Sequence, residues 1–127
     1  MNLLDIWESK SSWTTLSQLK KPPKLSLKLL RYEKKVIDEV DICEKARVNF
    51  VRQITGAGPN ERANIEHGTP QHTEFLEKFS SFLNESESEL ESFDMTLDAV
   101  IDQLDPSNKI SEHDLGVLEP FFKQEDK

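Results

Sequence analysis

The sequence predicts a mostly α-helical protein, and two observations carry this prediction. Apolar residues recur at three- and four-residue steps over two long segments, and a glycine-rich segment separates them. We therefore expect one domain built on a long antiparallel helix pair, with short helices before it and a small α or α/β tail after it. The expected elements are short helices in 1–19, a long helix over 24–54, a loop over 55–69, a helix over 70–89 and short tail elements in 92–122.

The first segment predicts one or two short amphipathic helices with a break near residues 9–12. Its apolar residues follow helical spacing, and Pro22-Pro23 ends this segment and suits the first turn of the next helix. The long helix over 24–54 contains no glycine or proline. At 1.5 Å per residue it forms a rod of roughly 45 Å, which is long for so small a domain. The rod needs a second helix, another subunit or both, so we expect a homo-oligomer, most simply a dimer.

The connection over 55–69 holds three of the four glycines and exceeds the usual length of a loop, which indicates a mobile or functional segment. Thr69-Pro70 supplies a hydroxyl cap and a proline for the first turn of the following helix. That helix carries one apolar stripe and is expected to extend to about residue 89. The stripe consists of Phe75, Leu76, Phe79, Phe82 and Leu83.

The tail leaves one alternative open, because residues 93–97 alternate as a short strand does while 97–104 suit a short helix. Ser111 and Asp114 have the spacing of a capping box and predict a last helix before Pro120. Large aromatic residues near both ends have to dock on core or partner surface, and we assign them to an interface. They are Trp7, Trp13, Phe121 and Phe122.

Charge is divided unevenly along the chain. The 16 basic and 24 acidic residues give a net charge of −8, with +4 in residues 1–54 and −12 in residues 55–127. Either the two halves attract each other or the basic half binds an anion. The acidic total argues against non-specific binding of nucleic acid, which depends on many phosphate contacts.

The basic residues of the long helix form a candidate anion-binding face. Lys24, Lys28, Arg31 and Lys35 are spaced by four, three and four residues, so they share one side of a helix. The alternatives are a solvated face or a match to the acidic half of the same chain. Arg47 interrupts the apolar face and needs an acidic partner on the next helix or an anion in an oligomer. Arg62 in the loop is the last candidate contact.

No motif for catalysis is present: the sequence has no phosphate-binding loop, no nucleophile elbow and no zinc motif of known spacing. The densest titratable cluster is Glu66, His67, His72 and Glu74. Two histidines with two carboxylates are a metal-ligand set, but Gly68 breaks any regular helix between the histidines, and we interpret the cluster as a polar loop beside a capped helix. We expect no enzyme activity, no metal and no cofactor.

The order of elements resembles small helical proteins encoded by tailed phages and prophages. The resemblance is loose over most of the chain and most specific at its end, Ile110-Ser111 through Asp114-Leu115 to Leu118-Glu119-Pro120-Phe121. It implies a phage origin and no reaction or catalytic residue. The single cysteine, the absence of a secretory signal and the absence of a long apolar run then favour the host cytoplasm without a membrane anchor.

Three classes of function follow as expectations. The first is a phage-encoded, non-enzymatic inhibitor of host defence that sequesters a host protein or a small phosphorylated signal. The second is a virion or assembly accessory for tail or head completion. The third, ranked last, is a metal-dependent enzyme built on the histidine cluster.

Overall fold

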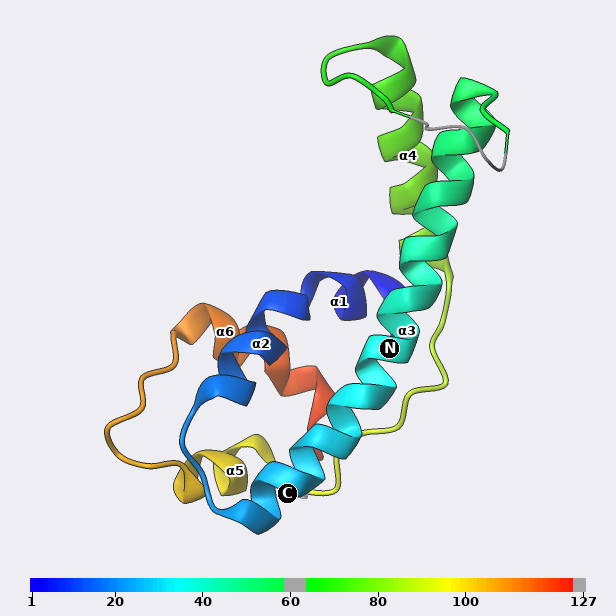
Figure 1. The fold of residues 1–127 in the computed structure, drawn as a ribbon. Coiled ribbons are helices and arrows are strands. Elements are labelled where there is room, and N and C mark those ends of the chain that lie inside the picture. The colour runs from blue at the N-terminus through cyan, green and yellow to red at the C-terminus, as the bar shows by residue number, and fades with distance from the viewer. Residues whose placement is uncertain (59–63, 125–127) are drawn as a thin grey trace.

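A computed structural model describes residues 1–58 and 64–124, and this part of the chain is mostly helical, as the sequence predicts. Figure 1 shows a rounded lobe from which the upper half of one long helix projects with a second helix beside it. We call residues 1–43 and 86–124 the lobe and residues 44–55 and 70–85 the arm. The helices are α1 (Leu3–Glu8), α2 (Lys10–Gln18), α3 (Pro23–Thr55), α4 (Pro70–Glu85), α5 (Leu97–Gln103), α6 (Glu112–Leu118) and the 3₁₀ turn η1 (Glu119–Phe121).

The long helix α3 belongs to both regions. Pro23 occupies its first turn, where a missing N–H costs nothing, and Gly56 ends it with a left-handed φ of 72°. These bounds differ by one residue at each end from the expected 24–54. Its buried residues fall on one side, which faces α1, α2 and the C-terminal segments in the lobe.

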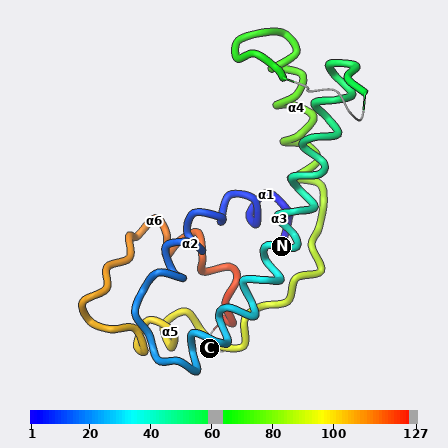
Figure 2. Tube along the Cα trace, viewed as in Figure 1, coloured from blue at the N-terminus to red at the C-terminus, as the bar shows by residue number. Residues whose placement is uncertain are grey.

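Helix α4 returns antiparallel to α3, as expected, but only along the arm (Figure 2). The Thr69 hydroxyl caps it by accepting from the His72 N–H at 3.2 Å. The expectation that this helix extends to 89 is wrong, because it ends at Glu85. The backbone beyond pairs with the N-terminus instead: the Leu3 N–H donates to the Ser86 carbonyl and the Ser88 N–H to the Met1 carbonyl, both at 2.9 Å.

The first two helices are separated at Ser9, inside the expected break. The Ser9 hydroxyl donates to the Ile6 carbonyl at 2.7 Å and the Ser9 N–H donates to the same carbonyl at 3.2 Å, which closes the end of α1. For the tail, the structure contains a helix but no regular strand in residues 93–97. Phe93 makes a single parallel bridge with Phe122, and a helix, α5, begins at Leu97.

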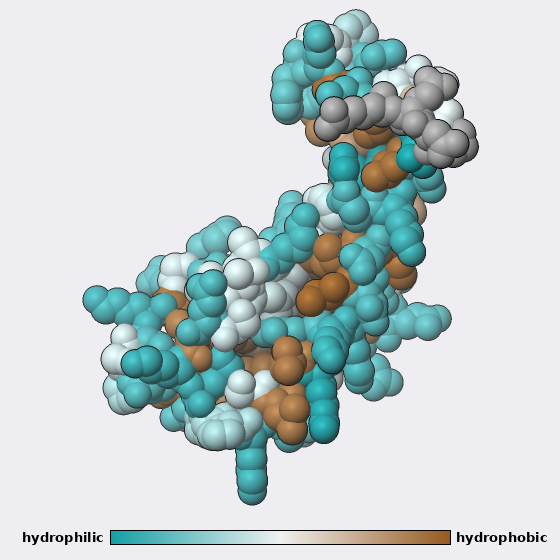
Figure 3. All heavy atoms as spheres, in the orientation of Figure 1, coloured by the Kyte–Doolittle hydropathy of each residue, from teal (hydrophilic) through white to brown (hydrophobic). Residues whose placement is uncertain are grey.

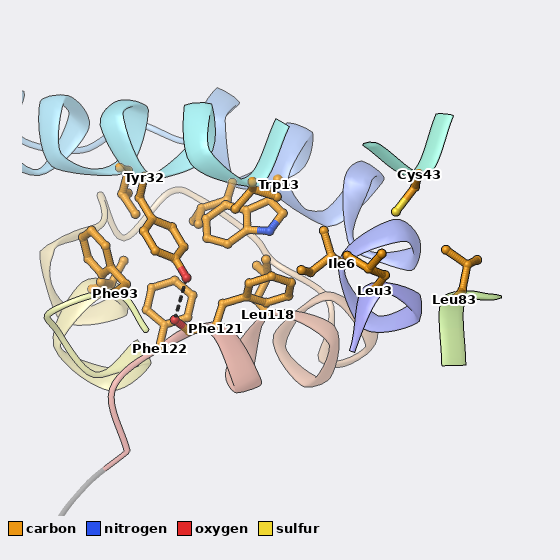
Figure 4. Packing of buried hydrophobic residues seen from close by; sticks show 14 of the residues in the cluster. Leu3, Ile6, Trp13, Tyr32, Cys43, Leu83, Phe93, Leu118, Phe121 and Phe122 are labelled. Carbon is orange, nitrogen blue, oxygen red and sulfur yellow. Dashed lines mark hydrogen bonds between the residues drawn. The ribbon is translucent and has the colours of Figure 1, made fainter. Parts of the chain in front are cut away.

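Aromatic rings form the centre of the lobe (Figure 4). Trp13 packs within 5.4 to 5.8 Å of Tyr32, Phe121 and Phe122, measured between ring centroids, and Phe93 lies 5.5 Å from Phe122. These rings come from α2, α3 and the C-terminal third of the chain, so the core joins segments that are far apart in sequence.

The core corrects the assignment of three aromatic residues to an interface. Trp13, Phe121 and Phe122 are 5%, 0% and 1% exposed within the single chain, which leaves no surface for a partner. Trp7 differs, because it is partly exposed: its ring packs edge-on against Phe79 at 5.3 Å, and the Lys10 ammonium lies over it at 3.4 Å. Trp7 therefore connects α1 of the lobe to α4 of the arm.

Apolar surface remains visible along the course of α3 (Figure 3). Its exposed large apolar side chains are Leu27, Leu30, Ile37 and Ile42, and Leu76 on α4 is exposed as well. Among residues 1–58 and 64–124, no helix has the length and apolarity that crossing a membrane requires.

Candidate functional site: a groove along the basic side of α3

A groove of about 610 Å³ lies between α3 and the extended segment 89–94. In Figure 1 this segment descends beside the lower half of α3 on its way from α4 to α5. We call this hollow the α3 groove. Its lining consists of Lys28, Arg31, Tyr32, Lys35, Asp38 and Glu39 from the helix and of Glu89, Leu90, Glu91, Ser92, Phe93 and Asp94 from the segment.

Tyr32 fixes the width of the groove. Its hydroxyl donates to the Glu91 carbonyl at 2.7 Å and lies 3.3 Å from the Phe121 carbonyl oxygen. The Phe93 N–H donates to that same Phe121 carbonyl at 2.8 Å. Burial raises the pKa of Tyr32 to about 12, because the phenolate would lose its hydration. A neutral tyrosine therefore holds the extended segment against α3.

The predicted basic face forms one wall of this groove. Lys28 pairs with Asp94 at 3.1 Å, across the groove, and both side chains are more than half exposed. Arg31 and Lys35 line the groove and form no ion pair with any part of the chain that the structure describes. Lys24 precedes them on the same helix and is exposed, outside the lining.

The opposite wall and the upper end of the groove are acidic. With its three cations and five carboxylates, the lining has a net charge of −2. The match between the basic helix and the acidic half of the same chain, which the sequence left open, is thus present in the structure. A small phosphorylated ligand would meet five carboxylates here, whereas a protein segment carrying both signs of charge would find a partner for each.

Arg47 lies on the arm, apart from the groove, and its expected partner is corrected. Instead of an acidic residue on the next helix, it pairs with Glu44 one turn earlier on α3, and its Nε donates to Glu44 Oε1 at 3.0 Å. This hydrogen bond is the main reason that the pKa of Glu44 lies below its usual range. Arg62 lies outside the described residues.

The histidine cluster is only half assembled. The rings of His67 and His72 lie edge to face with centroids 4.5 Å apart. Over residues 1–58 and 64–124, however, no three or more His, Cys, Asp or Glu side chains gather closely enough to hold a metal ion. The two rings alone are a contact at the entrance of α4.

Sequence reasoning found the basic wall of the groove and missed its other half. Tyr32 on α3 and the acidic side chains of Glu89, Glu91 and Asp94 complete the lining, and no local pattern in the sequence places them opposite the basic face. The division of charge between the two halves was the one signal that pointed to their pairing, and it carries no information on which residues meet.

Comparison with known proteins gives no relative: no protein-family model matches the chain, and neither a curated protein nor a solved structure matches it.

Proposed function

We propose that this chain is a phage-encoded, non-enzymatic binding protein that holds a segment of a host protein in the α3 groove and thereby inhibits host defence. One observation carries the proposal: Arg31 and Lys35 line an open groove without a carboxylate partner in the described chain, while Glu89 and Glu91 stand exposed on the other wall. Two rows of opposite charge with apolar Leu90 and Tyr32 between them suit a protein segment.

The balance of charge favours a protein partner over a small phosphorylated signal. Phosphate binding gains from converging cations and backbone N–H donors and is opposed by nearby carboxylates. Of the basic residues predicted to contact an anion, Lys28 is already paired with Asp94, and Arg47 with Glu44 on the arm. The phage origin rests on the resemblance in sequence, above all on the motif at 110–121.

Affinity capture from a lysate of the host bacterium tests the proposal. The bait is the full chain, and the variant Arg31→Glu/Lys35→Glu reverses the two unpaired cations without touching the core. Lys45→Glu is the matched control, since Lys45 is an exposed cation on α3 that does not line the groove. The expected result is a host protein recovered by the unmodified chain and by Lys45→Glu and lost with the double variant.

Recovery of the same proteins by all three baits would show that the groove is not the binding site. Calorimetry with phosphorylated nucleotides provides the second arm. If a nucleotide gives heat of binding with the unmodified chain and none with Arg31→Glu/Lys35→Glu, the ligand of the groove is a small anion and not a protein segment.

A further inference from the structure

Beside the groove, α3 carries an exposed stripe that lies outside the buried face of the helix. Its residues follow each other at intervals of three, four, three and four, so they form one line along the helix. All five are exposed, and three of them are large apolar residues with 48% to 55% of their surface in water. We call this line the outer stripe. It consists of Leu27, Leu30, Lys34, Ile37 and Asp41.

An apolar cavity borders the outer stripe. It lies between α2 and α3, measures about 330 Å³, and has Ile37 of the stripe in its lining together with Trp13, Val36 and Val40. Two buried polar atoms without a hydrogen-bond partner, Trp13 Nε1 and Glu33 Oε1, belong to residues of the same lining. A second helix on the stripe would cover this apolar surface, which water now contacts.

The charge order along α3 identifies that second helix. Residues 24–35 contain five cations and one carboxylate, a net charge of +4, and residues 36–44 contain four carboxylates and no cation, a net charge of −4. A copy of α3 laid antiparallel sets each basic half against an acidic half, whereas a parallel copy sets like charges together. The helix is complementary to itself in reverse, which suits an antiparallel interface about a two-fold axis.

We propose that two copies of this chain pair through the outer stripe of α3, antiparallel and about a two-fold axis between Lys34 and Ile37. Leu30 and Ile37 supply the apolar centre, at the seven-residue spacing of a two-helix seam. Lys34 reaches the acidic half of the partner helix, where Asp41 of the partner lies about one turn beyond the level of Lys34. Neither residue forms an ion pair within the described part of its own chain. The α3 groove is a separate surface beside the stripe, and none of its lining residues belongs to the stripe.

Sedimentation equilibrium of the full chain measures the association, with the 14.7 kDa mass of one chain as the monomer reference. The unmodified chain is expected to reach twice that mass as its concentration rises. Leu30→Ser/Ile37→Ser is expected to raise the dissociation constant about tenfold or more, because both side chains leave the centre of the interface. Leu76→Ser is the matched control, an exposed leucine on the arm that is expected to leave association unchanged.

Charge exchange tests the antiparallel arrangement. Lys34→Glu alone and Asp41→Lys alone each place like charges across the interface and are expected to weaken the dimer. Lys34→Glu/Asp41→Lys restores the opposite pairs and is expected to restore it. A monomer at every concentration overturns the proposal, as does a dimer that Leu30→Ser/Ile37→Ser leaves intact, or a double charge variant no tighter than the single ones. Circular dichroism of each variant confirms that these exposed substitutions leave the fold unchanged.

Discussion

The lobe and the arm share one helix and differ in what holds it. In the lobe, α3 lies against α1, α2 and C-terminal segments, and its buried residues Leu29, Tyr32 and Val36 are nearly inaccessible to water. In the arm, α3 meets α4, and of the four phenylalanines between the two helices only Phe79 is buried. The same helix is thus anchored by non-local packing at one end and by a single neighbour at the other, so stability is expected to fall along it.

The largest contrast is expected from truncating one ring in each region. Phe121→Ala removes a fully buried ring from the aromatic centre of the lobe and is expected to cost about 3–5 kcal/mol in the free energy of unfolding. Phe82→Ala removes a ring that is already partly in water, and is expected to cost about 1–2 kcal/mol. Urea unfolding of both variants measures the difference. Equal losses would mean that the arm is packed as tightly as the lobe.

The variant Tyr32→Phe measures the contribution of the tyrosine hydroxyl apart from that of its ring. The ring stays in the aromatic cluster, while the Glu91 and Phe121 carbonyls lose the tyrosine hydroxyl, at an expected cost of about 1–2 kcal/mol. Because the pKa of Tyr32 is raised from 10 to about 12 on folding, its contribution is complete below pH 10 and is lost as the pH rises through 12. Unfolding measured from pH 8 to 12 should therefore show a weaker alkaline loss in Tyr32→Phe than in the unmodified chain.

Each region has a helix with a hydroxyl cap, so the same kind of substitution can be compared in both. Thr69 caps α4 of the arm, and Ser111 caps α6 of the lobe by accepting from the Asp114 N–H at 3.1 Å. Each change to alanine is expected to cost about 1 kcal/mol. Thr69→Ala should speed hydrogen exchange mainly within α4, whereas Ser111→Ala should lower the denaturation midpoint of the whole chain. A global effect of the same size from both variants would contradict a division between lobe and arm.

Glu33→Gln is expected to have the smallest effect, and it has the opposite sign. Burial raises the pKa of Glu33, against the pull of Lys21, so the charged form destabilises the folded lobe above the ordinary pKa of a glutamate. The amide is therefore expected to stabilise the chain at neutral pH, with the gain disappearing as the pH falls below about 4. Glu77→Gln on the exposed side of the arm is the control and should show no such gain. A neutral or negative effect at pH 7 would show that Glu33 is solvated.

Local sequence signals predicted the helices where their ends are set locally. Proline at the start of α3, glycine after it and the hydroxyl at Thr69 each act within one turn, so the sequence places these boundaries closely. The apolar pattern extends the expected α4 four residues past its end at Glu85, because that end depends on the N-terminus. Hydrogen bonds from Leu3 and Ser88 draw this segment into an extended course that no local pattern reveals.

The candidate site was half predictable for the same reason. Helical spacing places Lys28, Arg31 and Lys35 on one face without reference to the rest of the chain. The acidic wall opposite them is held beside α3 by the hydrogen bond of Tyr32 to the Glu91 carbonyl, a contact across 59 residues. The motif at 110–121, the most specific part of the resemblance to phage proteins, has a structural role: Ser111 caps α6 and Phe121 fills the core.

The difference between lobe and arm bears directly on the proposed function, because both the α3 groove and the outer stripe lie on the lobe half of α3. Native-state hydrogen exchange resolved along α3 tests this difference most directly. The slowest exchange is expected over residues 25–36, with residues 45–55 and α4 opening at lower free energy and without unfolding of the lobe. Uniform protection along the whole of α3, or an arm that opens only with the lobe, would contradict a stable binding lobe carrying a weaker arm.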